Sequence, residues 1–495
     1  MIALASVNSG VGHLLGYDNM KKKLLFLLLS SLLVPALSLA QRKQESQLTS
    51  YAFTHVTIID ATGAPAQPDM TLVVMGAHIG ALGKDGKVRI PANAQVIDAS
   101  GKFLIPGLWD MHAHTVGDWF LPLYLANGIT GVRDMGNDAQ AEMQLRRKWT
   151  ESGTVSPRLV SAGPIVDGPR PIWPFSIAVA NAEEGRRAVS TVKRDFDFVK
   201  VYSLLPREAY FAIADEAKKQ KIPFAGHVPM SVSALEASDA GQKSIEHLEG
   251  VLLASSSDEA ALMKKAADVL KQPDPRTSAP LVRLALAKRA METYDEMKAR
   301  QLFARFVKNG TWQVPTLTVL RALAYLDDPD FIKDSRLKYV PAPFRLGWNP
   351  DNDFRLKGRT AEDWANVKKV YRKQLEIVGA MNRAGIALLA GTDTPNPYCF
   401  PGFSLHDELA LLVQAGLTPM EALQTATRNP ARFLGREKEL GTIQTGKLAD
   451  LVLLEANPLA DIRNTQRINA VMLGGHLLKK EVLQKLLADV EAVNK

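Results

Sequence analysis

The sequence has very little cysteine: Cys399 is the only one in 495 residues. A single cysteine excludes any intrachain disulfide, so the core alone has to stabilise the fold. Cys399 lies in the proline-rich segment Asn396–Pro401. In such a segment a cysteine is more often a small buried apolar side chain than a nucleophile, and we predict that buried role.

Long apolar runs are also scarce. The run Leu24–Val34 is too short to span a bilayer, and Pro35 follows it. Three lysines precede the run, and small residues stand just before a cleavage point after Ala40. This order is typical of a secretory signal peptide over residues 1–40. We therefore expect an exported protein, periplasmic or secreted, with no stable membrane span after cleavage.

Two alternatives concern this leader. In one, translation starts at Met20, so that residues 1–19 are not translated. In the other, the apolar run stays uncleaved as an N-terminal anchor helix. A lipoprotein anchor is excluded because no cysteine follows Ala40. Each alternative places the folded part outside the cytoplasm.

Charge of one sign is not concentrated anywhere in the chain. The net charge is +8, of which residues 1–40 carry +2, so the remainder carries +6. Its basic residues come in scattered pairs such as Arg186-Arg187 and Lys368-Lys369. Scattered pairs are usually solvated helix faces, so we expect no nucleic-acid partner. The expected partner is a small-molecule or dipeptide substrate, and the sequence leaves a homo-oligomer open.

The pattern of apolar residues changes twice along the chain. Short runs of alternating apolar and polar residues with glycine turns over residues 41–106 predict β-strands, and the same pattern returns over residues 436–495. We expect both chain ends to build one small β-sandwich domain. Between them, over residues 107–435, apolar runs alternate with amphipathic helices, as in parallel βαβ units.

The middle segment contains eight apolar runs of strand length. Eight βα units form a (β/α)8 TIM barrel, so we predict an α/β fold with the active site at the carboxyl ends of the strands. The long intervals near residues 254–310 and 320–380 predict helical insertions. The predicted strands are Leu108–His114, Ile129–Asp134, Leu159–Ala162, Phe198–Tyr202, Phe224–His227, Ser244–His247, Gln313–Leu317 and Ile386–Gly391.

Two histidines close the first predicted strand. His112 and His114 are two residues apart, so their side chains leave the strand on the same face and can bind one metal ion. Such a pair alone is a moderate signal. Its place at a carboxyl strand end strengthens the prediction of a metal site.

Lys200 stands in the middle of the fourth predicted strand. Alternation places it on the same face as Phe198 and Tyr202, opposite two valines. A charged lysine in a buried strand is costly unless it is paired or chemically changed. It is therefore either a salt-bridged structural residue or a lysine carboxylated by CO2, whose carbamate oxygens bridge two cations.

Three further residues end the fifth, sixth and eighth strands. His227 and His247, taken singly, fit satisfied core histidines as well as ligands. Asp393 follows the eighth strand, and taken singly it fits a turn or helix-capping aspartate as well. Four histidines at three separate strand ends are hard to explain as core residues.

Taken in chain order, these residues resemble the ligand set of the amidohydrolase superfamily. That superfamily has an H-x-H pair on strand one, a carboxylated lysine on strand four, histidines on strands five and six, and an aspartate on strand eight. Segment Gly446–Val452 is also typical of its C-terminal part. Gly131–Asp134 and Leu405–Leu409 are similar to the branch of prolidase-like and imidazolonepropionase-related proteins.

The resemblance implies a role for each residue of the set. His112, His114 and Asp393 would hold a buried metal ion, and His227 and His247 a more exposed one. The carbamate of Lys200 would bridge the two ions. A hydroxide shared by two divalent cations, zinc being best suited, would be the nucleophile. Asp393 would act as the catalytic base and then as the acid.

Two more residues are weaker candidates for substrate binding. Tyr202 shares the face of Lys200, and in prolidase-like relatives a tyrosine there contacts the substrate; a packed core tyrosine is the alternative. His406 follows the eighth strand and would line the pocket, unless it lies at the surface or caps a helix. His55, His78 and His476 are expected to be structural.

The expected function is that of an exported, binuclear, metal-dependent hydrolase. It would cleave the amide bond of a dipeptide, with Xaa-Pro as one option, or of an N-acyl amino acid. One alternative is an esterase or lactonase that uses the same site. Another is a mononuclear deaminase or imidazolone ring hydrolase, which Lys200 argues against. A non-enzymatic scaffold is disfavoured because the ligand set is complete.

Overall fold

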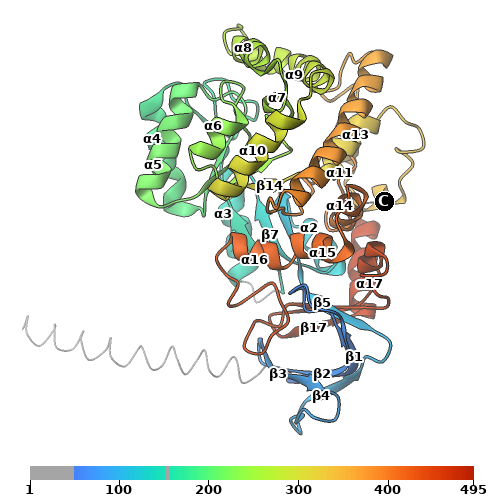
Figure 1. Cartoon of the computed structure of the whole chain (residues 1–495). Coiled ribbons are helices and arrows are strands. Elements are labelled where there is room, and N and C mark those ends of the chain that lie inside the picture. Colours follow the sequence, from blue (N-terminus) through green and yellow to red (C-terminus); the bar gives the residue numbers. More distant parts are fainter. Residues whose placement is uncertain (1–48, 152–154, 495) are drawn as a thin grey trace, which may run out of the picture.

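The computed structural model describes residues 49–151 and 155–494 (Figure 1). The predicted signal peptide therefore lies outside the described residues. Within this part of the chain, no helix is both long enough and apolar enough to cross a membrane. The described chain has an α/β part and, below it in Figure 1, a sheet part.

Both chain ends contribute to one connected eight-stranded sheet. Its order is β17-β16-β15-β5-β1-β2-β3, with β4 paired to β1. The two ends meet where β5 and β15 pair antiparallel, from Pro106–Leu451 to Phe103–Leu454. Its strands are β1 Tyr51–Ile58, β2 Gln67–Met75, β3 His78–Lys84, β4 Gln95–Asp98, β5 Phe103–Pro106, β15 Leu451–Leu454, β16 Ile468–Leu473 and β17 His476–Lys479.

This sheet has its own core because β-branched and leucine side chains of both chain ends meet on one side of it. Val56 and Leu104 from the N-terminal end are fully buried there, beside Leu451 and Met472 from the C-terminal end. Strands of both chain ends thus lie in one continuous sheet rather than in two facing ones.

The middle of the chain forms two parallel sheets. The three-stranded sheet has the order β6-β7-β8, and the six-stranded sheet has the order β10-β9-β11-β12-β13-β14. Seven of these strands match predicted strands to within a few residues, and β7 matches in full. Their bounds are β6 Leu108–Ala113, β7 Ile129–Asp134, β8 Arg158–Ser161, β9 Val166–Asp167, β10 Ile177–Ala178, β11 Val199–Val201, β12 Phe224–Gly226, β13 Ser244–Glu246 and β14 Trp312–Val314.

The eighth predicted strand, Ile386–Gly391, is not a regular strand. Its backbone nevertheless runs between β14 and β6: Leu389 N–H donates to Gln313 O at 3.0 Å, and Met111 N–H donates to Ala390 O at 2.9 Å. Parallel pairing is limited to isolated bridges such as Gln313–Leu388. The prediction of a regular strand was therefore wrong, although the segment lies where the strand was expected.

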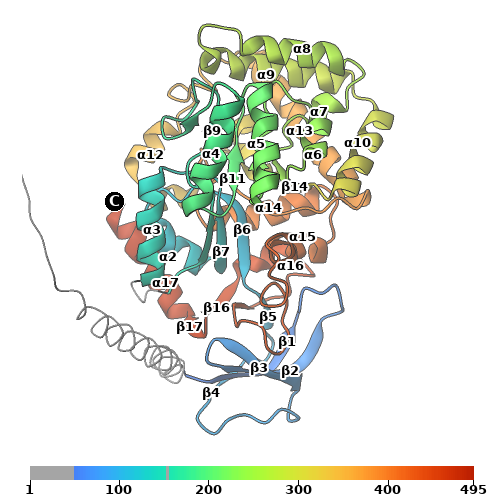
Figure 2. The ribbon, with the colours of Figure 1, turned by 90° about the vertical axis from the view of Figure 1, so that its left-hand side faces the viewer.

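Helices follow most of these strands and cover the outside of the α/β part (Figure 2). The predicted insertions are helical as expected. The helices before β14 are α2 Phe120–Ala126, α3 Ala139–Glu151, α4 Ala182–Asp195, α5 Arg207–Gln220, α6 Ala234–Asp239, α7 Val251–Ala254, α8 Glu259–Val269, α9 Pro275–Glu292 and α10 Glu296–Asn309. Those after β14 are α11 Leu317–Tyr325, α12 Ala342–Gly347, α13 Ala361–Arg383, α14 Phe403–Gln414, α15 Pro419–Thr425, α16 Arg428–Phe433 and α17 Lys480–Val493.

Local sequence signals explain several element ends. Thr418 caps α15 as a capping box with Glu421: the hydroxyl oxygen of Thr418 accepts from Glu421 N–H at 3.2 Å. Asn181 caps α4 by accepting from Glu184 N–H. Cys399 is fully buried against Val319 and Ala322, as predicted for an apolar side chain.

Candidate metal centre

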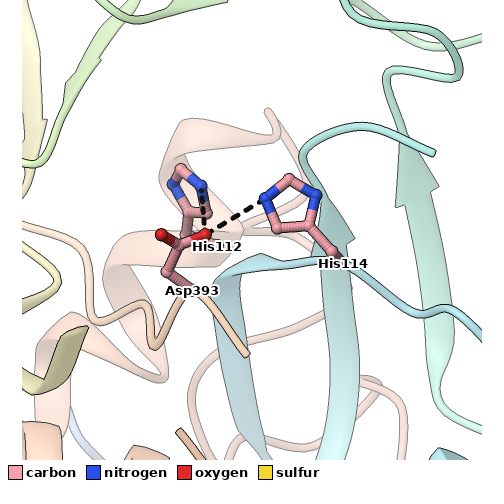
Figure 3. A group of neighbouring side chains, drawn as sticks. All are labelled: His112, His114 and Asp393. Carbon is pink, nitrogen blue, oxygen red and sulfur yellow. Dashed lines mark ion pairs between the residues drawn. The ribbon is translucent and has the colours of Figure 1, made fainter. Parts of the chain in front are cut away.

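Three predicted ligands converge at the carboxyl end of β6 (Figure 3). Asp393 Oδ1 lies 3.3 Å from His112 Nε2 and 3.1 Å from His114 Nε2. The three ligand atoms all lie within 4.8 Å of one another. Burial alone would raise the pKa of Asp393, but the neighbouring His247 and His112 hold it well below its ordinary value. The carboxylate is therefore ionised at neutral pH.

The Nδ1 atoms of His112 and His114 are occupied by acceptors from the protein. His112 Nδ1 lies 2.7 Å from Glu246 Oε2, and His114 Nδ1 donates to Gly136 O at 2.6 Å. A carboxylate and a carbonyl can only accept, so each ring carries its proton on Nδ1. Nδ1 of each ring is therefore engaged, and Nε2, which faces Asp393, is the atom that would bind a metal ion. Burial opposes it, but the hydrogen bond to Asp393 and the charge of that carboxylate raise the pKa of His114 above its ordinary value.

The other two histidines repeat this arrangement. His247 Nδ1 lies 2.7 Å from the hydroxyl of Thr316, which itself donates to Pro315 O at 2.8 Å. Because that hydroxyl proton is already used, His247 donates and its Nε2 stays free, 3.9 Å from Asp393 Oδ2. His227 Nδ1 contacts Ser203 Oγ at 2.8 Å. Burial lowers the pKa of both rings well below the ordinary histidine value.

Ring contacts connect all four histidines. The ring centroids of His114 and His112 are 5.6 Å apart, those of His112 and His247 are 4.5 Å apart, and those of His247 and His227 are 4.8 Å apart. Tyr202 continues the series, because its ring stacks on His227 at 4.0 Å. Lys200 Nζ lies 5.8 Å from the centroid of the Tyr202 ring.

Lys200 is fully buried, and its Nζ has no hydrogen-bond partner. His112 Nε2 and Asp393 Oδ1 are likewise buried without a hydrogen-bond partner. A buried polar atom that lacks a partner is costly, and such atoms in a native site call for an absent water or ion. Burial lowers the pKa of Lys200 to about 8, against the opposing effect of Glu246 and Asp393. The neutral amine, the form that reacts with CO2, is therefore accessible near neutral pH.

The backbone at this site is constrained. His247 and Asp393 have φ values of 58° and 60°, in the left-handed region that costs a non-glycine residue about 1–3 kcal/mol. Gly391 allows close approach, since a Cβ there would lie 2.6 Å from the Cβ of His112. Gly226 has a φ of 133°, and a Cβ there would lie 2.9 Å from Lys200 Cδ. Strain and close packing thus coincide with the predicted ligands.

Comparison with known proteins agrees with this geometry. The model of the amidohydrolase family matches residues 103–478, about three quarters of the chain. The chain belongs to the amidohydrolase family. The family resemblance inferred from the sequence is thereby confirmed.

Individual relatives of this amidohydrolase are distant. Ochratoxinase from Aspergillus niger is 34% identical over 128 residues, 25% of this chain and 26% of that protein. Imidazolonepropionase from Pseudomonas aeruginosa (strain UCBPP-PA14) is 36% identical over 110 residues, 22% of this chain and 25% of that protein. The alignments thus span about a quarter of these curated relatives.

The solved structures show that the amidohydrolase fold, of TIM-barrel type, extends over most of the chain. A Xaa-Pro dipeptidase with bound methionine in its active site superposes with a TM-score of 0.63 at 19% sequence identity. The match covers 87% of this chain and 100% of that structure.

The donor set of this amidohydrolase fits divalent metal ions. Four imidazole rings, an ionised carboxylate and a partnerless lysine amine lie together in one region of the site. Imidazole and carboxylate are the ligands that zinc and similar cations prefer. His112, His114 and Asp393 form the tightest group, and His247, His227 and Lys200 lie next to it.

The two weaker candidates differ. Tyr202 is half-buried beside His227, and its hydroxyl accepts from Trp173 Nε1 at 3.1 Å, so it lies at the site. His406 does not: it is fully buried in α14, with Nδ1 3.0 Å from Thr465 Oγ1 and Nε2 3.1 Å from Asn127 O. Asn127 precedes β7, at the opposite strand end. The prediction of a substrate contact for His406 is therefore corrected to a structural role.

Two buried charged residues behind His112 were not singled out from the sequence. Glu246 accepts from Ser244 Oγ at 2.5 Å and contacts His112 Nδ1. Arg133 Nη2 donates to Glu246 at 3.0 Å, and its Nε donates to Met111 O at 2.6 Å. The sequence contained a signal for Glu246, because it is a charged residue within a predicted buried strand, as Lys200 is. Together they orient the ring of His112.

We expect Arg133→Met to lower the free energy of unfolding by about 3–5 kcal/mol, because Glu246 would keep a buried charge without its partner. Denaturant unfolding monitored by circular dichroism measures this. The double variant Arg133→Met/Glu246→Gln removes both charges and should recover part of the loss. A single variant as stable as the wild type would contradict the buried pair.

Proposed function

We propose that this protein is an exported amidohydrolase with two divalent metal ions that cleaves the amide bond of a dipeptide or an N-acyl amino acid. The observation that carries the proposal is the convergence of four imidazole rings, Asp393 and the partnerless amine of Lys200. His112, His114 and Asp393 would hold one ion, and His227 and His247 the other. Zinc suits these donors.

Lys200 would bridge the two ions as a carbamate. Its neutral Nζ attacks the carbon of CO2, an N–C bond forms, one C–O electron pair moves to oxygen, and a proton leaves Nζ. The product places two oxygen donors where the amine now has no partner. Full burial of Lys200 protects the carbamate from the solvent.

Asp393 is the residue that would transfer protons. Two divalent cations, when bound, polarise a carbonyl and lower the pKa of water so that it becomes a nucleophile at neutral pH. The ionised Asp393 carboxylate accepts the proton of the attacking water and delivers it to the leaving nitrogen. Tyr202 and Trp173, which bond to each other beside His227, would contact the substrate.

The substrate class rests on the chemistry of the site together with the names of similar proteins. A Xaa-Pro dipeptidase has the same fold, and ochratoxinase and imidazolonepropionase share sequence segments. We therefore include Xaa-Pro dipeptides among the proposed substrates. Export rests on the signal-peptide pattern over residues 1–40.

Two finer features of the fold belong to the same proposal. The hydrogen bonds of residues 387–390 to Gln313 and Met111 support closure of the parallel strands into a (β/α)8 barrel. The burial of side chains from both chain ends inside the eight-stranded sheet supports a small sandwich-like domain.

The test is metal analysis together with product release by the purified mature protein. After zinc loading we expect about two metal ions per chain and amine release from a panel of Xaa-Pro dipeptides, other dipeptides and N-acyl amino acids. If the protein releases acid from esters or lactones but no amine from amides, the activity is that of an esterase or lactonase, not of an amidase. Full activity with one ion would overturn the two-metal scheme. Protein that neither binds nor responds to metal would favour a non-enzymatic role.

A further inference from the structure

We propose that the substrate carries one bulky apolar side chain, of about leucine or phenylalanine size, that binds in a pocket beside His247. This inference rests on the proposed function and specifies its substrate. The pocket lies between the loops after β12 and β13 and helices α8 and α9. Figures 1 and 2 show α8 and α9 side by side beyond the carboxyl ends of these strands.

The pocket adjoins the candidate metal centre. His247 is part of its lining, and the Nε2 atom of the same residue lies 3.9 Å from Asp393 Oδ2. A group held at the metal centre is therefore within one side-chain length of the pocket. The pocket has an apolar wall that includes Val228, Met230, Leu252, Met263, Leu286 and Ala287.

Its size fits one side chain rather than a whole substrate. The cavity volume is about 210 Å³. Pockets that enclose a complete drug-sized ligand are about 300–1,000 Å³. The volume is several times that of one water molecule, about 30 Å³ in the liquid. A leucine or phenylalanine side chain fills such a space, whereas glycine or alanine leaves it largely unused.

The polar groups of the wall disfavour a positively charged side chain. Arg283 Nη1 donates to Glu249 Oε1 at 2.7 Å, so the carboxylate of the wall is already paired. A cationic side chain placed there would lose its water and lie beside the guanidinium of Arg283. Glu249 Oε1 also lies 3.7 Å from His227 Nδ1, so this pair is on the side of the metal centre. The buried Nη2 of Arg283 has no hydrogen-bond partner and is a donor for a substrate oxygen.

Sequence position supports a specificity role for this wall. Helices α8 and α9 belong to the long insertion between β13 and β14, outside the set of strand-end residues that hold the metal centre. In such barrels the loops that follow the strands determine the substrate, while the strand ends carry the chemistry.

The test uses two variants on α9 that differ only in the face they occupy. Ala287→Phe fills the pocket, whereas Ala285→Phe places the same side chain on the exposed face of the helix. Substrates are pairs of dipeptides and N-acetyl amino acids in which one side chain is Ala, Leu, Phe or Lys, varied on each side of the scissile bond in turn. The readout is kcat/KM for each substrate.

For the wild type we expect kcat/KM to be about ten- to a hundredfold higher with Leu or Phe than with Ala, on one side of the bond, and lowest with Lys. Ala287→Phe should abolish this preference, so that kcat/KM for the Leu and Phe substrates falls to the level of the Ala substrate. Ala285→Phe should retain the preference. Met263→Ala, a second variant that enlarges the pocket, should shift the preference toward larger side chains.

The failures are distinguishable. Amide hydrolysis without any preference for apolar side chains overturns the pocket inference and leaves the proposed function standing. An equal loss on all substrates in Ala287→Phe, with no shift in Met263→Ala, does the same. No hydrolysis of any amide overturns the proposed function, and the pocket inference fails with it.

Discussion

Replacing Lys200 by alanine is expected to lower kcat/KM by more than about a hundredfold and to reduce the metal content of the protein. Removing even the hydrogen-bond partner of a metal ligand lowers metal affinity or activity about 10–100-fold. The loss of a ligand shared by two ions should therefore exceed that range. Lys200→Met serves as the closer variant, because methionine keeps the buried apolar stem and removes only the amine. Steady-state kinetics and elemental analysis of the same samples measure both effects.

The control for the fully buried Lys200 is a partly buried lysine outside the candidate metal centre. Lys243 precedes β13 at the opposite strand end, and its Nζ lies 4.4 Å from the ring of Phe433. Lys243→Met should retain activity within a few-fold. Metal-depleted wild type reloaded with zinc should regain more activity with bicarbonate present, and Lys200→Met should show no such effect. An active Lys200→Ala variant with two bound ions would contradict the bridging role.

The sequence predicted the strands of the α/β part well where the apolar pattern is local. Strand β7 matches over Ile129–Asp134, where Gly128 and Gly136 mark the turns on either side and all six residues are buried in the structure. The eighth strand failed for a physical reason. The segment pairs with its neighbours only through isolated bridges, Gln313–Leu388 and Ala113–Thr394, which fall short of a regular ladder, and only the folded structure shows which residues meet there.

The candidate ligands were predictable because strand order brings their positions to one end of the sheets. What the sequence does not contain is the identity of the partners that come from distant strands. Glu246 lies 134 residues after His112, and their contact depends on the packing of β13 opposite β6. The prediction for His406 was wrong for a related reason. Its position in the sequence, soon after the eighth segment, does not determine which side of α14 its side chain occupies.

The sheet built from both chain ends was expected only from the alternation of apolar residues and the glycine turns. The register of its strands was not predicted. Pairing of β5 with β15 depends on how the α/β part closes between them, since about 345 residues separate Pro106 from Leu451. Composition similarly indicated helical insertions, while their role as the wall of a pocket appears only when α8 and α9 are placed beside the metal centre.

Asp393→Asn should lower kcat by about 10²–10⁴-fold, the range for removing a general acid–base group, with any loss of metal adding to that. Asparagine keeps the size and one oxygen of Asp393 but cannot accept a proton, and it lacks the charge that faces His112 and His114. Asp134→Asn is the matched control. Asp134 is also a buried carboxylate at a strand end, but it accepts from the backbone N–H groups of Thr115 and Gly136.

The leaving group separates the two roles of Asp393. If the residue delivers a proton to the departing nitrogen, its loss matters most for alkylamide substrates, whose amines leave poorly without protonation. An anilide with electron-withdrawing groups leaves without that help, so the deficit of Asp393→Asn should shrink at least about tenfold on such a substrate. If Asp393 serves only as a ligand, the deficit stays the same for both substrates and follows the metal content. A constant deficit at full metal occupancy would limit Asp393 to electrostatic stabilisation and assign the proton transfer to another group.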